Sequence, residues 1–456
     1  MITRTLKQIA LMLGMDCDKY IDLNITGVSI DSRKVETGNL FVPFKGENVD
    51  GHAYVEKAVA NGAVATLWQK DVPNPPTDLP ILFVEDTLAA LQMIAEKYLQ
   101  EVSPIVIGIT GSNGKTTTKD MTASVLAQKY KVHKTEGNFN NHLGLPLTIL
   151  RMAEDTEVAV LEMGMSGKGE IELLSTLAKP HLAVITNIGE SHLLDLGSRE
   201  GIADAKLEIL TGLQEDGVVI YNGDEPLLKE KLKHASFNLQ SFGRSQQNTI
   251  YPLHIEAGNE NTKFITNTCA DEFTIPVLGN HNVLNAMAAI LVATELNVSP
   301  EQIRTGLVEL KMTGMRMEMV IGINGEKIIN DAYNASPTAM RAAIELVSEL
   351  PGFKNKLLVL GDMLELGAEE VQFHKMIGES IKPNTIQKLF TYGPLGQYIA
   401  EGALQTLGTD AVFAFQDKQA LIEELKKHIE KDDLILVKAS RGMKLEEVVQ
   451  ALQKAE

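Results

Sequence analysis

Cysteine is scarce in this sequence. Only Cys17 and Cys269 occur among the 456 residues. Two cysteines cannot form a disulfide framework, and they cannot supply a four-cysteine zinc site. The composition therefore fits a reducing compartment such as the cytosol.

Long apolar runs are also missing. No stretch approaches the roughly 20 consecutive apolar residues that a membrane-spanning helix requires. The first residues, Met1 to Leu6, lack the apolar core of a secretory signal peptide. We therefore expect a soluble cytoplasmic protein with no segment inserted in a membrane.

Positive charge is in short supply. The chain has 42 Lys and Arg against 60 Asp and Glu, which gives a formal net charge of −18 and a pI near 5.1. A strongly acidic surface repels phosphate backbones, and this argues against general nucleic-acid binding. A local basic pocket for a small anionic ligand remains compatible with the composition.

Apolar material, in contrast, is sufficient for several packed cores. Hydrophobic residues make up 44% and charged residues 22% of the chain, which is ordinary for globular proteins and excludes disorder as the main state. At about 150 residues per domain, the length predicts about three domains. No internal repeat with a period of about 20 to 50 residues is visible, so a solenoid is excluded.

Changes of pattern along the chain predict three domains, which span residues 1–102, 103–313 and 314–456. The first mixes short strand-like runs with helical stretches at 53–61 and 87–100. Its proline-rich segment at 71–80 is too stiff for a helix or a central strand and predicts a loop. These features predict a small α+β domain.

From Ile105 onward, short apolar strands alternate with helices, the pattern of βαβ units around a parallel sheet. In the middle region we expect strands at 105–110, 158–161, 182–186 and 217–221, helices at 115–128, 171–178 and 200–213, a hairpin-like stretch at 242–277, and helices at 282–296 and 300–310. In the last region we expect strands at 327–330, 357–360, 388–392, 412–415 and 434–437. The fold class is therefore α/β, with two doubly wound domains behind the α+β domain.

The strongest motif is a glycine-rich run between a predicted strand and a predicted helix, Gly108-Ile109-Thr110-Gly111-Ser112-Asn113-Gly114-Lys115-Thr116. Glycines allow backbone N–H groups to converge on phosphate oxygens, and the helix N-terminus adds positive potential. Lys115 can reach the β- and γ-phosphates, and the Thr116 hydroxyl can ligate Mg²⁺. Strict P-loop spacing requires glycine at Ile109, so the loop is a variant. The alternative is a simple turn with an exposed lysine, but the strand–loop–helix order favours nucleotide binding.

Polar residues just after the strands are further candidates, because ligands of open parallel sheets bind beyond the carboxyl ends of the strands. Glu162 ends one strand and fits a Mg²⁺ ligand or, equally, a helix-capping charge. His192 follows the next strand, but imidazole suits Mg²⁺ less well than oxygen does, so by itself it indicates a surface histidine. Lys206 lies in an amphipathic helix, where residue chemistry alone favours a solvated lysine.

Together these motifs resemble the Mur ligase family, ATP-dependent amide-forming enzymes of peptidoglycan synthesis. The resemblance covers nearly the whole chain, and the run Thr110 to Thr116 matches the family's nucleotide loop, including the displaced glycine. Other similar segments lie at 31–35, 38–42, 46–52, 137–146 and 279–285.

The resemblance implies a fold and a set of cofactors. The implied domains are an N-terminal UDP-binding domain, a central P-loop ATPase-like parallel sheet and a C-terminal Rossmann-like α/β domain for the amine substrate. The implied cofactors are ATP and two Mg²⁺ ions, with Lys206 carbamylated, because an ammonium would repel Mg²⁺ whereas a carbamate supplies two anionic oxygens. The implied metal ligands are Thr116, Glu162, His192 and Lys206, and the implied catalytic residues are Lys115, Glu162, His192 and Lys206. The implied ATP-binding residues are Thr110, Gly111, Ser112, Asn113, Gly114, Lys115, Thr116, Asn280, His281, Asn285, Arg316 and Asp331.

The C-terminal segments 330–337 and 360–367 resemble the family member that adds D-alanyl-D-alanine to UDP-N-acetylmuramoyl-tripeptide. The run from Lys438 to Lys444 departs from the usual Gly-Ser-Arg-Ser but keeps Arg441, and the Asp-Asn-Pro-Arg run of the diaminopimelate-adding member is missing. The implied substrate-binding residues are Ser32, Arg33, Asn140, Asn141, Asn334, Ser336 and Arg441. We expect UDP-N-acetylmuramoyl-tripeptide and D-alanyl-D-alanine as small-molecule partners. We also expect the protein to be a monomer and to act in cell-wall formation, cell shape and division.

The implied reaction proceeds through an acyl phosphate, because a carboxylate is a poor acyl donor until ATP phosphorylates it. The carboxylate of the dipeptide is expected at the N-terminus of the helix that follows Ser336-Pro337. Two alternatives remain at this point. A folylpolyglutamate synthase would share the ATP machinery but would not need the N-terminal UDP-type segment. A nucleotide-dependent switch would not need the C-terminal domain or the family's substrate loop, which the segment 137–146 resembles.

Overall fold

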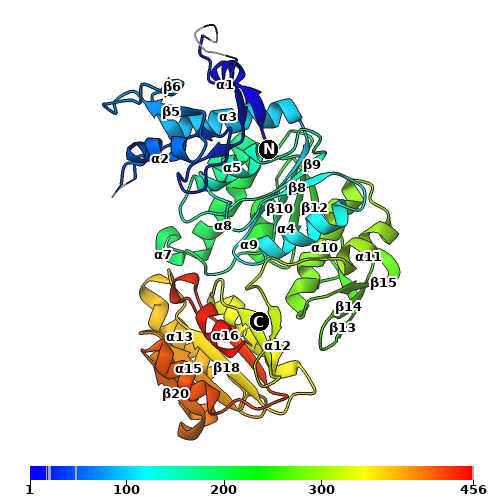
Figure 1. Cartoon of the computed structure of the whole chain (residues 1–456). Coiled ribbons are helices and arrows are strands. Elements are labelled where there is room, and N and C mark those ends of the chain that lie inside the picture. Colours follow the sequence, from blue (N-terminus) through cyan, green and yellow to red (C-terminus); the bar gives the residue numbers. More distant parts are fainter. Residues whose placement is uncertain (17, 19–21, 47–48, 454–456) are drawn as a thin grey trace.

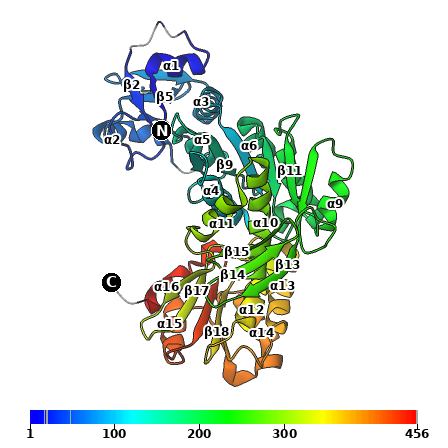
Figure 2. The same ribbon diagram turned by 90° about the vertical axis from the view of Figure 1, so that its right-hand side faces the viewer.

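The computed structural model describes residues 1–16, 18, 22–46 and 49–453, so Cys17 and part of the 46–52 segment lie outside the described residues. An N-terminal sheet lies at one end of the molecule, a central sheet in the middle and a C-terminal sheet at the other end (Figures 1 and 2). This arrangement confirms the α/β class. Within the described part of the chain, no helix is long and apolar enough to cross a membrane.

The N-terminal part combines a parallel sheet of order β3-β4-β5-β6 with the antiparallel pair β1-β2. Its strands are β1 (Thr3–Thr5), β2 (Asn24–Thr26), β3 (Val28–Ser29), β4 (Leu40–Phe41), β5 (Ala65–Gln69) and β6 (Ile81–Val84). Its helices are α1 (Leu6–Met12), η2 (Gly51–Tyr54), α2 (Val55–Ala60) and α3 (Thr87–Val102). The buried face of α3 shares one hydrophobic core with the central sheet, and the Tyr98 hydroxyl donates to the Met152 carbonyl at 2.7 Å. This shared core fixes the N-terminal part against the middle of the molecule.

The central sheet is parallel, with the strand order β12-β11-β10-β7-β9-β8. Its strands are β7 (Ile105–Thr110), β8 (Val132–Lys134), β9 (Val158–Glu162), β10 (Leu182–Ile185), β11 (Val218–Asn222) and β12 (Asn238–Phe242), and an antiparallel sheet follows with β13 (Pro252–Ala257), β14 (Thr262–Thr266) and β15 (Cys269–Ile275). The helices are α4 (Lys115–Leu126), α5 (Gly144–Leu150), α6 (Glu170–Ala178), α7 (Leu193–Leu196), α8 (Arg199–Leu207), η3 (Glu208–Leu210), α9 (Pro226–Leu232), α10 (Asn280–Glu295) and α11 (Pro300–Val308).

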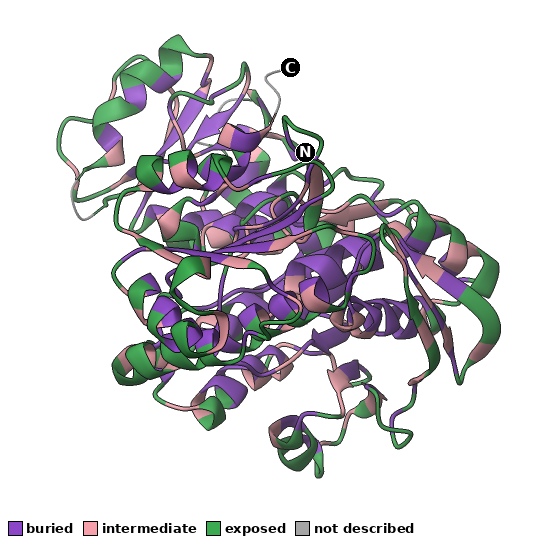
Figure 3. Cartoon of the chain, turned by 90° about the horizontal axis from the view of Figure 1, so that it is seen from below, coloured by how far each residue is buried: buried purple, intermediate pink, exposed green. Residues whose placement is uncertain are grey.

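Both faces of the central sheet are covered by helices. Val158 and Val160 of β9 point into the core formed with α4, α10 and α11, whereas Ala159 and Leu161 point into the core formed with α3, α5, α6 and α8. A strand buried on both faces must be apolar at every position, which explains the continuous hydrophobic runs in the sequence. The inner strands β7, β9 and β10 are accordingly buried, while the outer faces of the helices are exposed (Figure 3).

The C-terminal sheet has the order β16-β17-β21-β18-β19-β20, and only its edge strand β16 runs antiparallel among the described strands. Its strands are β16 (Glu318–Ile321), β17 (Lys327–Asp331), β18 (Lys356–Gly361), β19 (Lys388–Tyr392), β20 (Val412–Phe415) and β21 (Leu434–Lys438). Its helices are α12 (Pro337–Glu349), η4 (Gly367–Glu369), α13 (Glu370–Glu379), α14 (Gly396–Leu407), η5 (Thr409–Ala411), α15 (Lys418–Lys426), η6 (Arg441–Met443) and α16 (Glu446–Leu452).

The carboxyl ends of neighbouring strands lie side by side in both sheets. In the central sheet β9, β7 and β10 are adjacent, so Glu162, the loop after Thr110 and the segment after Ile185 meet at one edge. In the C-terminal sheet β17 and β21 are adjacent, which places Asp331 beside Lys438. Residues from both edges line one cavity.

Candidate active site

The glycine-rich loop between β7 and α4 turns at two glycines with left-handed or related backbone conformations. The φ angle is 141° at Gly111 and 81° at Gly114. A Cβ atom on Gly111 would lie 1.9 Å from Thr186 Oγ1, and one on Gly114 would lie 2.6 Å from Asn285 Oδ1. Both positions therefore require glycine.

The segment after β10 holds this loop in place. The Ser112 N–H donates to the Asn187 carbonyl at 3.0 Å, the Asn113 N–H donates to Asn187 Oδ1 at 2.9 Å, and the Thr186 hydroxyl donates to the Asn113 carbonyl at 2.6 Å. Asn187 was not among the site residues expected from the sequence. Its position directly after a strand at the carboxyl edge of the sheet was the available signal.

Lys115 and Thr116 of the glycine-rich motif lie close to Glu162, which ends the neighbouring strand β9. The Thr116 hydroxyl donates to Glu162 Oε2 at 2.9 Å, and Asn140 Nδ2 donates to Glu162 Oε1 at 2.8 Å. Lys115 Nζ donates to the Gly111 carbonyl at 2.7 Å. Burial lowers the pKa of Lys115 to about 8, with Glu162 opposing and Arg316 reinforcing the shift.

His192 lies at the boundary with the C-terminal domain, not on an open surface. Its Nδ1 atom is 2.6 Å from Glu365 Oε2, and the Leu194 N–H donates to the Glu365 carbonyl at 3.1 Å. Both His192 (φ 64°) and Glu365 (φ 65°) have left-handed backbones, an uncommon conformation for these residue types. Burial lowers the pKa of His192, although the Glu365 carboxylate acts in the opposite direction.

Lys206 is buried on the inner face of α8, with 1% of its surface exposed. Among the described residues its Nζ atom has no hydrogen-bond partner. Burial, reinforced by the charge of Lys115, moves the pKa of Lys206 well below its ordinary value. Residue chemistry alone favoured a solvated lysine, and that interpretation is wrong because neighbouring elements cover this face of the helix.

A cavity of about 610 Å³ lies between the central and C-terminal domains. The expected site residues that line it are Ser112, Asn113, Gly114, Lys115, Asn140, Asn141, Glu162, His192, His281, Asn285, Arg316, Asp331 and Asn334. On the C-terminal side the guanidinium of Arg316 lies 4.2 Å from the centre of the Tyr333 ring, and Lys438 Nζ donates to the Asn334 carbonyl at 2.9 Å. Lys438 pairs with Asp331 and was not selected from the sequence, although the run that contains it was.

The remaining expected site residues lie outside this cavity. Thr110, Gly111, Thr116 and Lys206 are buried, Asn280 begins α10, and Ser336 Oγ accepts a hydrogen bond from Asn113 Nδ2 at 3.2 Å. Arg33 is paired with Asp31 at 2.8 Å, the Ser32 carbonyl accepts from Asn61, and Arg441 is paired with Glu446 at 2.7 Å. The structure therefore gathers the nucleotide-side residues but not Ser32, Arg33 and Arg441.

The N-terminus of α12 already has a carboxylate beside it. Ser336 caps the helix, and the Thr338 N–H and hydroxyl donate to the Glu190 carboxylate at 3.3 and 2.8 Å. This is the position at which the sequence placed the carboxylate of the dipeptide. Glu190 comes from the loop after β10, so the contact joins the two domains.

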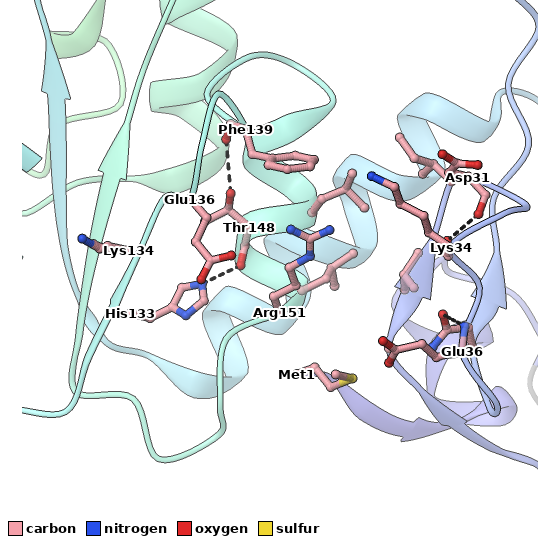
Figure 4. Close-up of a pocket in the computed structure, with 17 residues that line it drawn as sticks. Met1, Asp31, Lys34, Glu36, His133, Lys134, Glu136, Phe139, Thr148 and Arg151 are labelled. Atoms are coloured by element: carbon pink, nitrogen blue, oxygen red, sulfur yellow. Dashed lines mark hydrogen bonds between the residues drawn. The ribbon is translucent and has the colours of Figure 1, made fainter. Parts of the chain in front are cut away.

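A second cavity, of about 620 Å³, separates the N-terminal part from the central sheet. Lys34 extends into it from the N-terminal side and Arg151 from the central side (Figure 4). The guanidinium of Arg151 lies 4.6 Å from the centre of the Phe139 ring. Because Phe139 lines this cavity and Asn138 and Asn140 line the first, the 137–142 loop borders both.

The donor set fits a divalent cation only if further ligands are supplied. Among the described residues no group of three or more His, Cys, Asp and Glu side chains is arranged to hold a metal ion. The Thr116 hydroxyl and the Glu162 carboxylate are nevertheless hard oxygen donors of the kind that Mg²⁺ prefers. The buried Nζ of Lys206, without a partner in the described structure, is a poor neighbour for a cation as an ammonium and a suitable one as a carbamate.

Comparison with protein-family models places three consecutive matches on the chain. Residues 24–99 match "Mur ligase family, catalytic domain", residues 109–293 match "Mur ligase middle domain", and residues 315–441 match "Mur ligase, glutamate ligase domain". The UDP-N-acetylmuramoyl-tripeptide–D-alanyl-D-alanine ligase of Bacillus subtilis (strain 168) is 54% identical over 99% of both chains.

Solved structures agree with these matches. A crystal structure of MurF from Acinetobacter baumannii is similar with a TM-score of 0.89, at 30% identity over 98% of both chains. The MurF ligase from Thermotoga maritima in complex with ADP is similar with a TM-score of 0.82, at 30% identity over 93% of this chain and 96% of that one.

Proposed function

The chain belongs to the Mur ligase family, and from that premise we infer that it catalyses the ATP-dependent, ADP-forming addition of D-alanyl-D-alanine to UDP-N-acetylmuramoyl-tripeptide in peptidoglycan synthesis. The observation that carries this function is the 54% identity, over 99% of both chains, to the Bacillus subtilis ligase that bears this name. The nucleotide loop and the C-terminal domain on either side of one cavity supply the parts that such a ligase needs. We also propose domain boundaries after residues 102 and 313.

In this reaction an oxygen of the tripeptide carboxylate attacks the γ-phosphorus of ATP, and ADP leaves. The amine of the dipeptide then attacks the carbonyl carbon of the acyl phosphate, phosphate leaves, and the nitrogen loses a proton. We assign Lys115 and Arg316 to charge stabilisation on the transferred phosphoryl group, because both cations line the cavity beside the loop. His281 and Asn285, on α10 behind the loop, are assigned to the adenine side.

Mg²⁺ is the cation that this chemistry uses, and when bound it neutralises charge on the phosphates. Thr116 and Glu162 are the residues that would hold one ion, and His192 with a carbamylated Lys206 would hold a second. Support comes from the oxygen pair of Thr116 and Glu162 and from the buried, unpartnered Nζ of Lys206 in the described structure. Glu365, beside Nδ1 of His192, would orient that ring.

We assign the UDP part of the substrate to the second cavity. Lys34 and Arg151 offer two cations for a diphosphate, and the Phe139 ring offers an apolar face. The 137–142 loop leads from this cavity to the first, so an extended UDP-linked peptide can place its carboxylate near Lys115 while its nucleotide stays at the N-terminal side. Asn140 and Asn141 lie along that path.

The function is tested by ADP release with a panel of amines. D-alanyl-D-alanine, lysine, diaminopimelate and glutamate are compared at equal concentration, each with and without the UDP-muramoyl-tripeptide. We expect release to require the UDP-tripeptide together with D-alanyl-D-alanine. Preference for a single amino acid would assign the chain to another member of the family, and release that ignores both substrates would indicate a nucleotide switch. A folded Lys115→Ala variant, expected to be inactive, controls for contaminating ATPases.

A further inference from the structure

A buried carboxylate on the nucleotide helix holds the start of the interdomain linker. Asp120 lies on α4, one and a half turns after Lys115, and is 1% exposed. Its Oδ2 atom accepts hydrogen bonds from both the backbone N–H of Thr313, at 2.9 Å, and the Thr313 hydroxyl, at 2.8 Å. Its Oδ1 atom accepts from Lys134 Nζ at 2.6 Å and lies 3.3 Å from Lys119 Nζ.

This carboxylate is ionised at neutral pH. Burial alone would raise the pKa of Asp120, but the charges of Lys119 and Lys134 and the N–H of Thr313 together lower it below its ordinary value. Hydrogen bonds to an ionised acceptor are stronger than neutral ones. Asp120 therefore binds Thr313 more firmly than an ordinary loop contact would.

The linker is attached to the central domain at Thr313 and to the C-terminal domain from Met315 onward. Gly314 is exposed, and a Cβ atom placed on it would meet nothing closer than 3.6 Å. The next residues are attached to the other domain, because the Met315 N–H donates to Glu318 Oε2 at 2.9 Å and the Met317 N–H donates to Asp331 Oδ1 at 3.2 Å. The chain can thus turn at Gly314 between two fixed points.

Arg316 lies between the two attached residues of the C-terminal side. Met315 (φ 60°) and Met317 (φ 52°) have left-handed backbones, which non-glycine residues adopt only where the surroundings enforce them. Within the described structure the buried Nε atom of Arg316 has no hydrogen-bond partner, and the side chain lines the same cavity as Lys115. Because three residues span at most about 10 Å, the point at which Thr313 is held limits where Arg316 can stand.

We propose that Asp120 is a positioning residue: it fixes Thr313 to the nucleotide helix, so that rotation at Gly314 brings Arg316 to the phosphates bound by that same helix. The inference rests on the proposed function, in which Arg316 stabilises the transferred phosphoryl group. It adds a role for a carboxylate that contacts neither nucleotide loop nor cavity in the described structure.

The test uses Thr313→Val, which removes the hydroxyl bond while leaving Asp120 paired with both lysines. Ser124→Ala is the matched control, because Ser124 also lies on α4 and donates to the Gly306 carbonyl of α11 at 2.6 Å without touching the linker. We expect Thr313→Val to lower kcat about tenfold, since small misplacements of a catalytic group cost up to about 100-fold. KM for the UDP-tripeptide and the melting temperature should match Ser124→Ala, and Thr313→Ser should restore kcat.

A double-mutant cycle separates positioning from general packing. The dissociation constant of a non-hydrolysable ATP analogue is measured for Thr313→Val, Arg316→Ala and the double variant. We expect Thr313→Val to weaken binding several-fold in the parent chain and to have no effect once Arg316 is removed. Equal effects in both backgrounds, or a kcat for Thr313→Val equal to that of Ser124→Ala, would overturn the inference while leaving the function standing. If the parent chain released no ADP with its substrates, the proposed function would fail, and the analogue cycle alone would decide the role of Asp120.

Discussion

A buried lysine beside the nucleotide loop is the residue whose proposed role can be tested most directly. Lys206 is 1% exposed, and its Nζ atom has no partner among the described residues. An unpaired ammonium in such a place is costly, and burial moves the pKa of Lys206 well below its ordinary value, so the site favours the uncharged amine over the ammonium. The carbamate that we propose for Lys206 would form on this amine and would offer two anionic oxygens to a metal ion.

We therefore expect Lys206→Ala to lower kcat by on the order of 100-fold or more, comparable to the loss of one charge-stabilising group. Short-chain carboxylates or bicarbonate should restore part of the activity by filling the vacated anion position. The measurement is ADP release as a function of added acetate. Lys231→Ala is the control. Lys231 lies on α9, is exposed, and pairs with Asp204 of α8, the helix that carries Lys206.

Full activity of Lys206→Ala, with no response to acetate, would leave Lys206 as a structural residue. The melting temperature of each variant is recorded alongside, so that a loss of activity caused by unfolding is recognised. Any rescue would separate a chemical role from a packing role, because acetate cannot refill the methylene stem of the side chain.

Single residues also show where sequence reasoning stops. The order of strand, loop and helix was enough to predict the nucleotide loop, and Glu162 was a candidate because ligands bind beyond the carboxyl ends of parallel strands; the contact between Thr116 and Glu162 is seen only in the structure. The burial of Lys206 and the contact between His192 and Glu365 depend on which elements cover a helix face or close a domain boundary. Residue chemistry alone therefore assigned both residues to the solvent.

At the scale of secondary structure, the strands buried on both faces were predictable, the edge strand β20 was predicted at 412–415, and three other edge strands were missed. The strand predicted at 105–110 is β7, because a strand covered on both faces is apolar throughout. The edge strands β8, β12 and β16 are half exposed and polar or short, so they carry no such pattern. Helix α5 begins inside the predicted substrate loop, where Pro146 is tolerated because it lies in the first turn.

One helix of the C-terminal domain depends on a neutral histidine. His374 on α13 accepts the Met363 N–H through Nε2 at 2.8 Å, and its Nδ1 lies 2.6 Å from the Glu370 carbonyl. Burial lowers the pKa of His374 below its ordinary value. The unfolded chain then binds more protons than the folded one, so this contribution to stability is present above the unfolded pKa and is lost as the pH falls below about 6.5.

The free energy of unfolding of the parent chain should fall between pH 7.5 and pH 5.5 as His374 takes up a proton. We expect this fall to be smaller in His374→Gln by about 1 kcal/mol, the scale of one buried hydrogen bond. Glutamine can accept the Met363 N–H but cannot take up a proton. Denaturant unfolding at the two pH values measures the effect, with His428→Gln at a partly exposed position of the same domain as the control. Identical pH dependence in the parent chain and His374→Gln would contradict this assignment.

At the scale of the whole molecule, the contacts between the central and C-terminal domains include three pairs of polar side chains around the cavity. Asn113 meets Ser336, His192 meets Glu365, and Glu190 meets Thr338. Sequence patterns predicted each domain but not these pairings, which join residues up to 223 positions apart. An incoming amine must reach the cavity past them, so we expect the domains to separate and close again during turnover.

The Glu190 contact gives a prediction about the second substrate. The Thr338 N–H lies in the first turn of α12, where the dipeptide carboxylate is expected to bind, and Glu190 now accepts from it. A carboxylate of the protein and one of the substrate would compete for the same donor.

We therefore expect Glu190→Gln, which removes the charge but keeps the shape, to lower KM for D-alanyl-D-alanine by up to about fivefold, because a partly exposed contact of this kind is worth at most about 1 kcal/mol. KM for ATP should not change, and Glu200→Gln at the exposed start of α8 should leave both constants as they are. Steady-state ADP release at varied dipeptide concentration measures the effect. An unchanged or higher KM for the dipeptide would place its carboxylate away from α12, and the Glu190–Thr338 pair would then be only a contact between the domains.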